Sequence, residues 1–254
     1  NSGLPGRIRT VQIFDASDIY AYNADSADLQ TAMNAMTDTT GTNIQFQVSV
    51  KTAKATSGAD LVCLLVDTGS AVGVVGKGKQ LTSASGDSSA CYSVCASQSV
   101  ESEQTLAHEL GHNFGCGHAK GQADEPGPSA FASYAAGWAF TGDDGARYGT
   151  IMTAQNYTKG QTLTECGLFS SPLVSFHGTV IGNAADSDNA RVLRTTMPIA
   201  ERHVWNSIES VAVAFNANGG TVSEGCRVYG VGAALGTLPM PVRAVETITA
   251  SRMA

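Results

Sequence analysis

The chain has 254 residues, enough for one sizeable core or for two subdomains that share a cleft. Charged residues make up 15% and the formal net charge is −7, without the Lys and Arg clusters that phosphate binding requires, so we expect no nucleic-acid partner. The negative charge gives no attraction to an anionic membrane surface, and no apolar run approaches the roughly 18 residues of a membrane span. We expect a monomer away from membranes.

The first half of the chain alternates between strand and helix patterns. Residues 25–36 place Leu29, Ala32, Met33 and Met36 on one helical face, with Asp25 or Ser26 as the N-cap and Gly41 closing the segment. Strand patterns differ in kind: 7–14 and 44–50 alternate, 60–67 is continuously apolar and suits a strand buried on both faces, and 90–96 is short. The Gly-rich segment 71–79 predicts an edge strand or, equally well, a mobile loop. One of the segments 71–79 and 90–96 would border a cleft and accept an extended peptide by backbone pairing.

A helix is expected to begin near Ser102 and Glu103, with Leu106, Leu110 and Phe114 facing the core. Residues 108–118 then follow the pattern H-E-x-x-H-x-x-G-x-x-H. His108 and His112 project from one helical face, at the spacing that lets two imidazoles reach one small cation. Glu109 lies beside them, close enough to handle a metal-bound water.

The third histidine of the pattern needs a break in the helix. Six further helical residues would rise about 9 Å and carry His118 away from the ion. A left-handed Gly115 ends the helix and swings the backbone under the metal, so that His118 arrives as third ligand. Three protein nitrogens leave the fourth position of Zn²⁺ open for water, which is the catalytic arrangement.

Beyond the loop 121–128, an aromatic cluster is either the core of a lower subdomain or the wall of a side-chain pocket beside the metal. The possible pocket residues are Tyr134, Trp138 and, further along, Phe169. Residues 186–189 lack the spaced ligands of a calcium loop, so calcium is not supported and a turn before a helix is expected.

The C-terminal third predicts a helix over 189–208 that Pro198 breaks or kinks, then strand-like stretches at 211–215 and 226–231. His177 and His203 have no ligand-spaced partner and are expected to be structural or exposed. The tail 211–254 receives no functional role.

Six cysteines form an even, scattered set that suits disulfides in an oxidising compartment: Cys63, Cys91, Cys95, Cys116, Cys166 and Cys226. A second metal site at Cys91 and Cys95 is the alternative, and it lacks a matching second pair. The pairing stays open. No charged-then-apolar leader opens the chain, so we expect a secreted, mature or trimmed protein whose signal peptide or pro-segment lies outside these residues.

The zinc pattern resembles that of the metzincin metallopeptidases. Gly149 to Thr153 resembles the Met-turn of that family, with Met152 beneath the metal, and the segment 168–172 is similar to one in reprolysin-like (adamalysin-like) members. Ala119 stands where adamalysins usually have Asp, and Ala154 stands where astacin-like and serralysin-like members have Tyr, so no tyrosine ligand is expected.

The resemblance implies an α+β fold of the zincin type. A twisted mixed β-sheet would carry an active-site helix over a cleft, beside a smaller, mainly irregular or helical C-terminal subdomain. Residues 1–254 would form a single catalytic domain. An N-terminal subdomain, residues 1–116, would hold the sheet and the helix, and residues 117–254 would hold the third ligand and the Met-turn.

These features predict a secreted zinc endopeptidase acting on proteins or peptides. His108, His112 and His118 would hold one Zn²⁺, and Glu109 would act as general base on the bound water and return the proton to the leaving amine. The alternative is a zinc-retaining, non-catalytic binding module of the same fold. All five fixed positions of the pattern are intact, which favours the enzyme.

Overall fold

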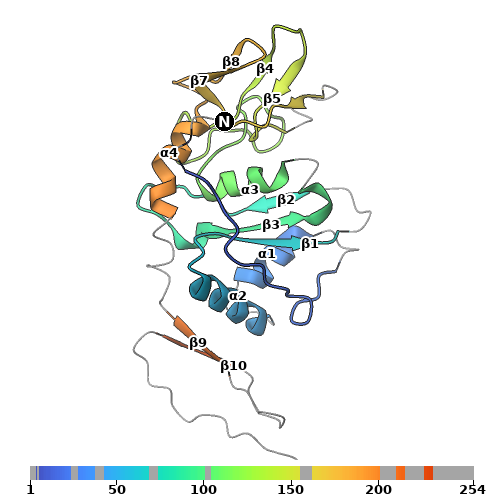
Figure 1. Cartoon of the computed structure of the whole chain (residues 1–254), viewed down its shortest axis with the longest axis vertical. Coiled ribbons are helices and arrows are strands. Elements are labelled where there is room, and N and C mark those ends of the chain that lie inside the picture. Colours follow the sequence, from blue (N-terminus) through green and yellow to red (C-terminus); the bar gives the residue numbers. More distant parts are fainter. Residues whose placement is uncertain are drawn as a thin grey trace, which may run out of the picture.

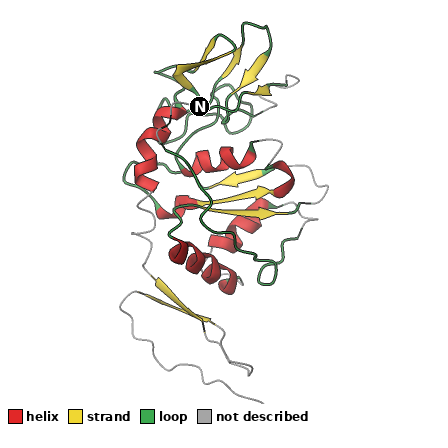
Figure 2. Ribbon diagram, viewed as in Figure 1, coloured by secondary structure: helices red, strands yellow, loops and turns green. Residues whose placement is uncertain are grey.

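The computed structural model describes residues 4, 6–23, 28–37, 43–68, 74–100, 104–154 and 162–200, together with the backbone of strands at 210–214 and 226–230 (Figures 1 and 2). Its elements, in chain order, are α1 (Leu29–Thr37), α2 (Ile44–Ser57), β1 (Val62–Val66), β2 (Gly76–Gly78), the 3₁₀ helix η2 (Ser88–Cys91), β3 (Tyr92–Ala96), the 3₁₀ helix η3 (Ser97–Ser99), α3 (Thr105–Asn113), β4 (Ala139–Thr141), β5 (Arg147–Gly149), β6 (Thr164–Glu165), β7 (Ser171–Phe176), β8 (Thr179–Ile181), α4 (Asn189–Ala200), β9 (Ser210–Ala214) and β10 (Cys226–Gly230).

A mixed three-stranded sheet in the order β1-β3-β2 forms the centre of the described molecule. The central strand β3 pairs in parallel with β1 and antiparallel with β2, with Val94 opposite Leu64 on one side and Lys77 on the other. Helices α1 and α2 cover one face and α3 covers the other (Figure 1). This layered α+β arrangement confirms the predicted fold class.

Helix α1 confirms the helix predicted over 25–36, and its apolar face packs into the core below the sheet. Leu29, Met33 and Met36 recur three or four residues apart and are buried against Val94. The proposed caps Asp25 and Ser26 lie outside the described residues. Asp28 takes that place, because its carboxylate accepts hydrogen bonds from the backbone N–H groups of the helix's first turn.

Residues 44–50 do not form the strand that their alternation predicts. They are the first half of α2, which ends at Gly58 in a left-handed conformation with φ of 67°. Phe46 and Val50 lie one helical turn apart and are buried in the same core, whereas Ile44 is half-exposed. Residues 51–57 continue the same helix, so the length of the helix and its packing override the local β propensity of residues 44–50.

Residues 7–14 are also wrongly predicted, because they form no strand in the structure. Ile13 is 90% exposed and Ile8 is 57% exposed, so the alternation buries neither. The strand predicted over 60–67 is present as β1, but it is an edge of the described sheet and Leu65 is 52% exposed, so it is not buried on both faces.

The region of the molecule on the other side of α3 is built from short sheets and α4 (Figure 2). Strands β4, β5 and β6 form one sheet and β7 pairs with β8. A turn at 183–187 precedes α4, as expected, and Asp188 caps that helix by accepting from the backbone N–H of Arg191. Pro198 lies inside the last turn of α4, and the rest of the predicted helix, with His203, lies outside the described residues.

The two strands predicted in the tail are present as an antiparallel pair, β9 and β10, which contacts α2. Among the described helices, none is both long and apolar enough to cross a bilayer. Five cysteines are free thiols in the structure: Cys63, Cys91, Cys95, Cys116 and Cys166. The expected disulfides remain a prediction, as does the subdomain boundary near residue 116.

Candidate active site

Helix α3 carries the first two histidines and is anchored directly to the sheet. It begins at Thr105, directly after Gln104, which has a left-handed φ of 52°. Residues 102–103, where the helix was expected to begin, lie outside the described residues. The fully buried Asn113 donates hydrogen bonds from Nδ2 to the carbonyls of Lys79 (2.8 Å) and Tyr92 (2.9 Å). These bonds fix the C-terminal end of α3 against β2 and β3.

Gly115 makes the turn that the pattern predicts. Its φ is 90°, in the left-handed region that favours glycine, and the helix ends just before it. A Cβ atom at this position would lie 2.9 Å from the carbonyl oxygen of Leu81, so space also requires glycine. The chain reverses here and returns His118 beneath α3.

The three imidazoles meet at one point. Nε2 of His118 lies 3.0 Å from Nε2 of His108 and 3.1 Å from Nε2 of His112. The three ligand atoms all lie within 4.8 Å of one another. Nitrogens bound at 2.0–2.1 Å to a tetrahedral zinc ion are about 3.3 Å apart, so the triad has the size of a zinc site.

The other nitrogen of each ring, Nδ1, is hydrogen-bonded to a backbone carbonyl. Nδ1 of His108 lies 2.9 Å from the carbonyl oxygen of Ile151, Nδ1 of His112 lies 3.1 Å from that of Cys116, and Nδ1 of His118 lies 2.8 Å from that of Glu125. Each carbonyl can only accept, so Nδ1 carries the proton and Nε2 keeps its lone pair. Three lone pairs that converge in this way are the donor set that Zn²⁺ binds.

The environment also favours the neutral, ligating form of the imidazole. Burial, followed by the charge of the neighbouring histidines, lowers the pKa of His108 to about 4 and the pKa of His112 well below its usual value. Both rings are therefore neutral at neutral pH. Metal affinity does not have to overcome protonation of these two ligands.

Glu109 is buried between α3 and β2. Ideal Cβ atoms built on Gly76 and Gly78 would lie 2.3 Å from Oε1 and 3.2 Å from Oε2 of this carboxylate, so it rests directly on the strand's glycine backbone. Burial is the main cause that raises the pKa of Glu109 to about 8. A higher pKa makes the carboxylate a stronger proton acceptor.

Met152 lies beneath the triad and is fully buried. A Cβ atom on Gly111 would be 2.6 Å from its sulfur, which places the thioether against the turn of α3 between the first two histidines. The carbonyl of Met152 accepts a hydrogen bond from the backbone N–H of Ala119 (3.1 Å), next to His118. The turn therefore packs against one ligand-bearing element and is hydrogen-bonded to the other.

Two further residues position the site, and the sequence does not predict either of them. The buried Asn189 donates from Nδ2 to the carbonyl of Gly117 (3.0 Å) and accepts from its N–H (3.3 Å), which holds the backbone of Gly117, the residue before His118. Gln80 donates from Nε2 to the carbonyl of Cys116 (3.1 Å), the same oxygen that orients His112. Both lie far from the pattern in sequence, and no local signal marks them.

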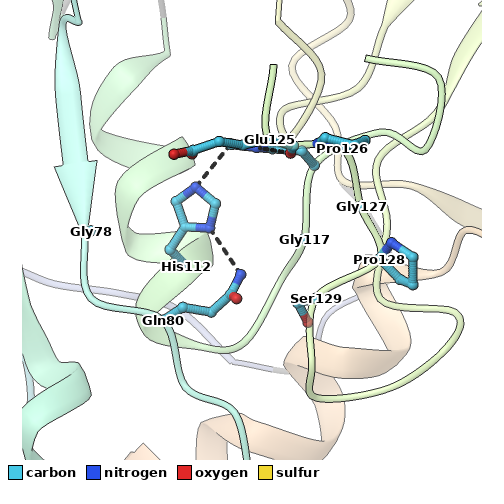
Figure 3. A pocket seen from close by; sticks show the side chains of 10 residues that line it. Gly78, Gln80, His112, Gly117, Glu125, Pro126, Gly127, Pro128 and Ser129 are labelled. Atoms are coloured by element: carbon cyan, nitrogen blue, oxygen red, sulfur yellow. Dashed lines mark hydrogen bonds between the residues drawn. The ribbon is translucent and has the colours of Figure 1, made fainter. Parts of the chain in front are cut away.

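The predicted aromatic pocket is not a single structure. Tyr134 and Phe169 pack into the core cluster around Met152, and Tyr134 also stacks under the guanidinium of Arg191, 4.1 Å from its ring centroid. Trp138 lines a separate cavity of about 350 Å³ beside Lys120. A cavity of about 300 Å³ adjoins the histidines themselves, and none of the three aromatic residues lines it (Figure 3). Their role as a substrate pocket remains a prediction.

An α+β fold with three converging imidazoles, a buried glutamate beside them and a methionine turn below defines a metzincin-like metallopeptidase. The sequence agrees. Residues 1–165 match the sequence model of the family described as "Metallo-peptidase family M12" (Reprolysin_5), so the chain belongs to that family. The chemistry of the donor set fits Zn²⁺, the metal that this family implies.

Two relatives come from Stenotrophomonas maltophilia, and each is named peptidyl-Asp metalloendopeptidase. The protein of strain K279a is 31% identical over 157 residues, covering 61% of this chain and 34% of the relative. The protein of strain R551-3 is 30% identical over 167 residues, covering 64% and 37%. The match thus spans little more than a third of each relative. A solved structure titled "Structure of a chaperone-substrate complex" has a TM-score of 0.46, 18% identity, and coverage of 72% of this chain and 28% of that one.

Proposed function

We propose that the chain is a secreted zinc endopeptidase that hydrolyses peptide bonds in proteins or peptides. The observation that carries the proposal is the convergence of the three Nε2 atoms, each ring held by a carbonyl on Nδ1, beside the buried carboxylate of Glu109. His108, His112 and His118 would hold Zn²⁺. When bound, the ion lowers the pKa of a coordinated water and polarises the scissile carbonyl.

Glu109 performs the proton transfers. Its carboxylate removes a proton from the attacking water as the water oxygen bonds to the scissile carbonyl carbon. The protonated carboxyl then delivers that proton to the amine as the C–N bond breaks, so that one carboxylic acid and one amine leave and the carboxylate is regenerated. The glycine platform of β2 holds the carboxylate in place for both steps.

The free edge of β2 is where the substrate backbone would bind. In the described sheet β2 pairs only with β3, so its other edge is available to an extended peptide. Gly76 and Gly78 bring this edge directly over Glu109. A peptide paired there would present its scissile bond next to the histidines.

The decisive experiment compares the wild-type chain with Glu109→Gln on fluorogenic peptides, with and without a chelator. Because the relatives' name specifies peptidyl-Asp, aspartyl peptides are the first substrates to test. We expect chelator-sensitive cleavage by the wild type, and a loss of about 10²–10⁴-fold in Glu109→Gln with its zinc content retained. Glu165→Gln in β6 is the control that carries the same change of charge away from the site.

Near-normal turnover by Glu109→Gln would refute the assigned role. A zinc-loaded wild type that cuts none of the peptides would instead favour the non-catalytic binding module. Secretion is supported by the even set of cysteines. It is tested by mass spectrometry of the medium of cells that express the natural gene, where absence of the protein would contradict it.

A further inference from the structure

The cavity of about 300 Å³ beside the histidines lies on one side of the metal site only. His112 and His118 line it, together with Gly78 and Gln80 on one side and the loop 125–129 on the other (Figure 3). Neither His108 nor Met152 takes part. A substrate paired with β2 over Glu109 therefore passes its mouth, because Gly78 belongs both to the platform and to the cavity wall.

Glu125 is fixed at this cavity by its own backbone. Its carbonyl oxygen accepts the hydrogen bond from Nδ1 of His118 (2.8 Å), and its φ of 47° places it in the left-handed region. The backbone of Glu125 is thus tied to the third metal ligand. Its side chain extends from the loop past His112 toward the side where Gly78 lies (Figure 3).

The cavity carries a single negative charge. Apart from the two histidines, Glu125 is the one ionisable residue among those that line it. No ion pair among the described residues involves its carboxylate, and that carboxylate is not among the clustered metal-ligand atoms.

We infer that this cavity is a substrate subsite for a cationic group of the bound peptide, and that Glu125 is its specificity-determining residue. The cation is a Lys or Arg side chain near the scissile bond or the free amino terminus of a short peptide. The inference rests on the proposed function and deepens it. A carboxylate at the mouth of a partly enclosed, concave site attracts such a group and disfavours an acidic one.

The test uses N-acetylated aspartyl peptides in which Lys, Gln or Glu occupies, in turn, each position on either side of the scissile bond. A parallel series without Lys is compared with free and acetylated amino termini, which separates the two sources of the cation. We expect wild-type kcat/KM to favour the cationic peptide by about two- to fivefold at one position, in line with a partly exposed ion pair.

Glu125→Gln should reduce that ratio to about one, and Glu125→Lys should favour Glu over Lys at the same position. Asp124→Asn removes the same charge from the neighbouring exposed residue, which does not line the cavity, and should keep the wild-type ratio. Zinc content is measured for each variant. Should a variant not fold, raising the ionic strength must still shrink the wild-type preference, because salt screens an exposed pair.

The inference would be overturned if the peptides are cut but the wild type and Glu125→Gln have equal ratios of kcat/KM for the Lys and Gln peptides. It would also be overturned if the wild type cuts the peptides with no cationic preference at any position. Failure of the zinc-loaded wild type to cut any peptide is a different result, because it removes the proposed function itself.

Discussion

The glycine platform under Glu109 gives a prediction whose size follows from one distance. A Cβ atom on Gly76 would lie 2.3 Å from Oε1 of Glu109, whereas an ordinary contact is about 3.4 Å. In Gly76→Ala the carboxylate must therefore move by about 1 Å. Misplacement of a catalytic group by about 1 Å costs roughly 10²-fold in rate, so we expect kcat to fall by about that factor.

The fold and the zinc site should survive Gly76→Ala, because the clash is with the end of a flexible side chain. Gly78→Ala is the matched comparison, since its Cβ would lie 2.6 Å from the backbone oxygen of Glu109, which cannot rotate away. We expect it to lose about 1–3 kcal/mol of unfolding free energy. The assay is kcat on one peptide, with bound zinc and thermal unfolding measured on the same samples. Wild-type kcat in Gly76→Ala would refute the idea that the platform positions the carboxylate.

Three other predictions concern side chains in different parts of the structure. Asn189→Ala removes both side-chain hydrogen bonds to the loop of the third histidine and should cost about 1–3 kcal/mol in chemical unfolding; an unchanged midpoint would contradict the clamp. The Sγ atoms of Cys63 and Cys95 lie 3.6 Å apart, so oxidation should link this pair, and non-reducing peptide mapping that finds both thiols free would contradict it. Tyr148→Phe removes the main hydrogen bond that lowers the pKa of Asp144, so that pKa should rise in an NMR titration; no rise would refute the assignment.

The zinc pattern was predictable because its geometry is local. Helical spacing alone brings His108 and His112 to one face, and the left-handed turn at Gly115 returns His118 within a few residues. No distant segment of the chain has to be known for these side chains to converge. The same holds for α1, whose apolar residues share one face of a single helix.

The wrong predictions concern segments whose secondary structure depends on contacts with distant parts of the chain. Residues 44–50 alternate as a strand would, but they share a helix with 51–57 because Phe46 and Val50 fill the core beneath the sheet. Residues 7–14 also alternate, and no strand partner lies beside them in the described sheets. A pattern of period 2 shows which faces a strand would have, but it does not supply the neighbour that a strand needs.

The residues that support the metal ligands could not be predicted from the sequence for the same reason. Gln80 lies 36 residues before its partner Cys116 and Asn189 lies 72 residues after its partner Gly117, and nothing in their local sequence indicates these contacts. Tyr134 and Phe169 pack against the core cluster around Met152, and their role in a substrate pocket remains a prediction. The cavity that adjoins the metal site is polar and contains Glu125, which no aromatic pattern marks.

The central claim is that three imidazoles hold one zinc ion with a position left for water. Zinc-edge X-ray absorption on the chain purified without chelators tests it most directly. We predict one ion per chain, a coordination shell of three imidazole nitrogens at about 2.0 Å and one oxygen, and loss of one nitrogen in His118→Ala. A chain that holds no zinc, or a coordination shell that contains cysteine sulfur, would contradict it.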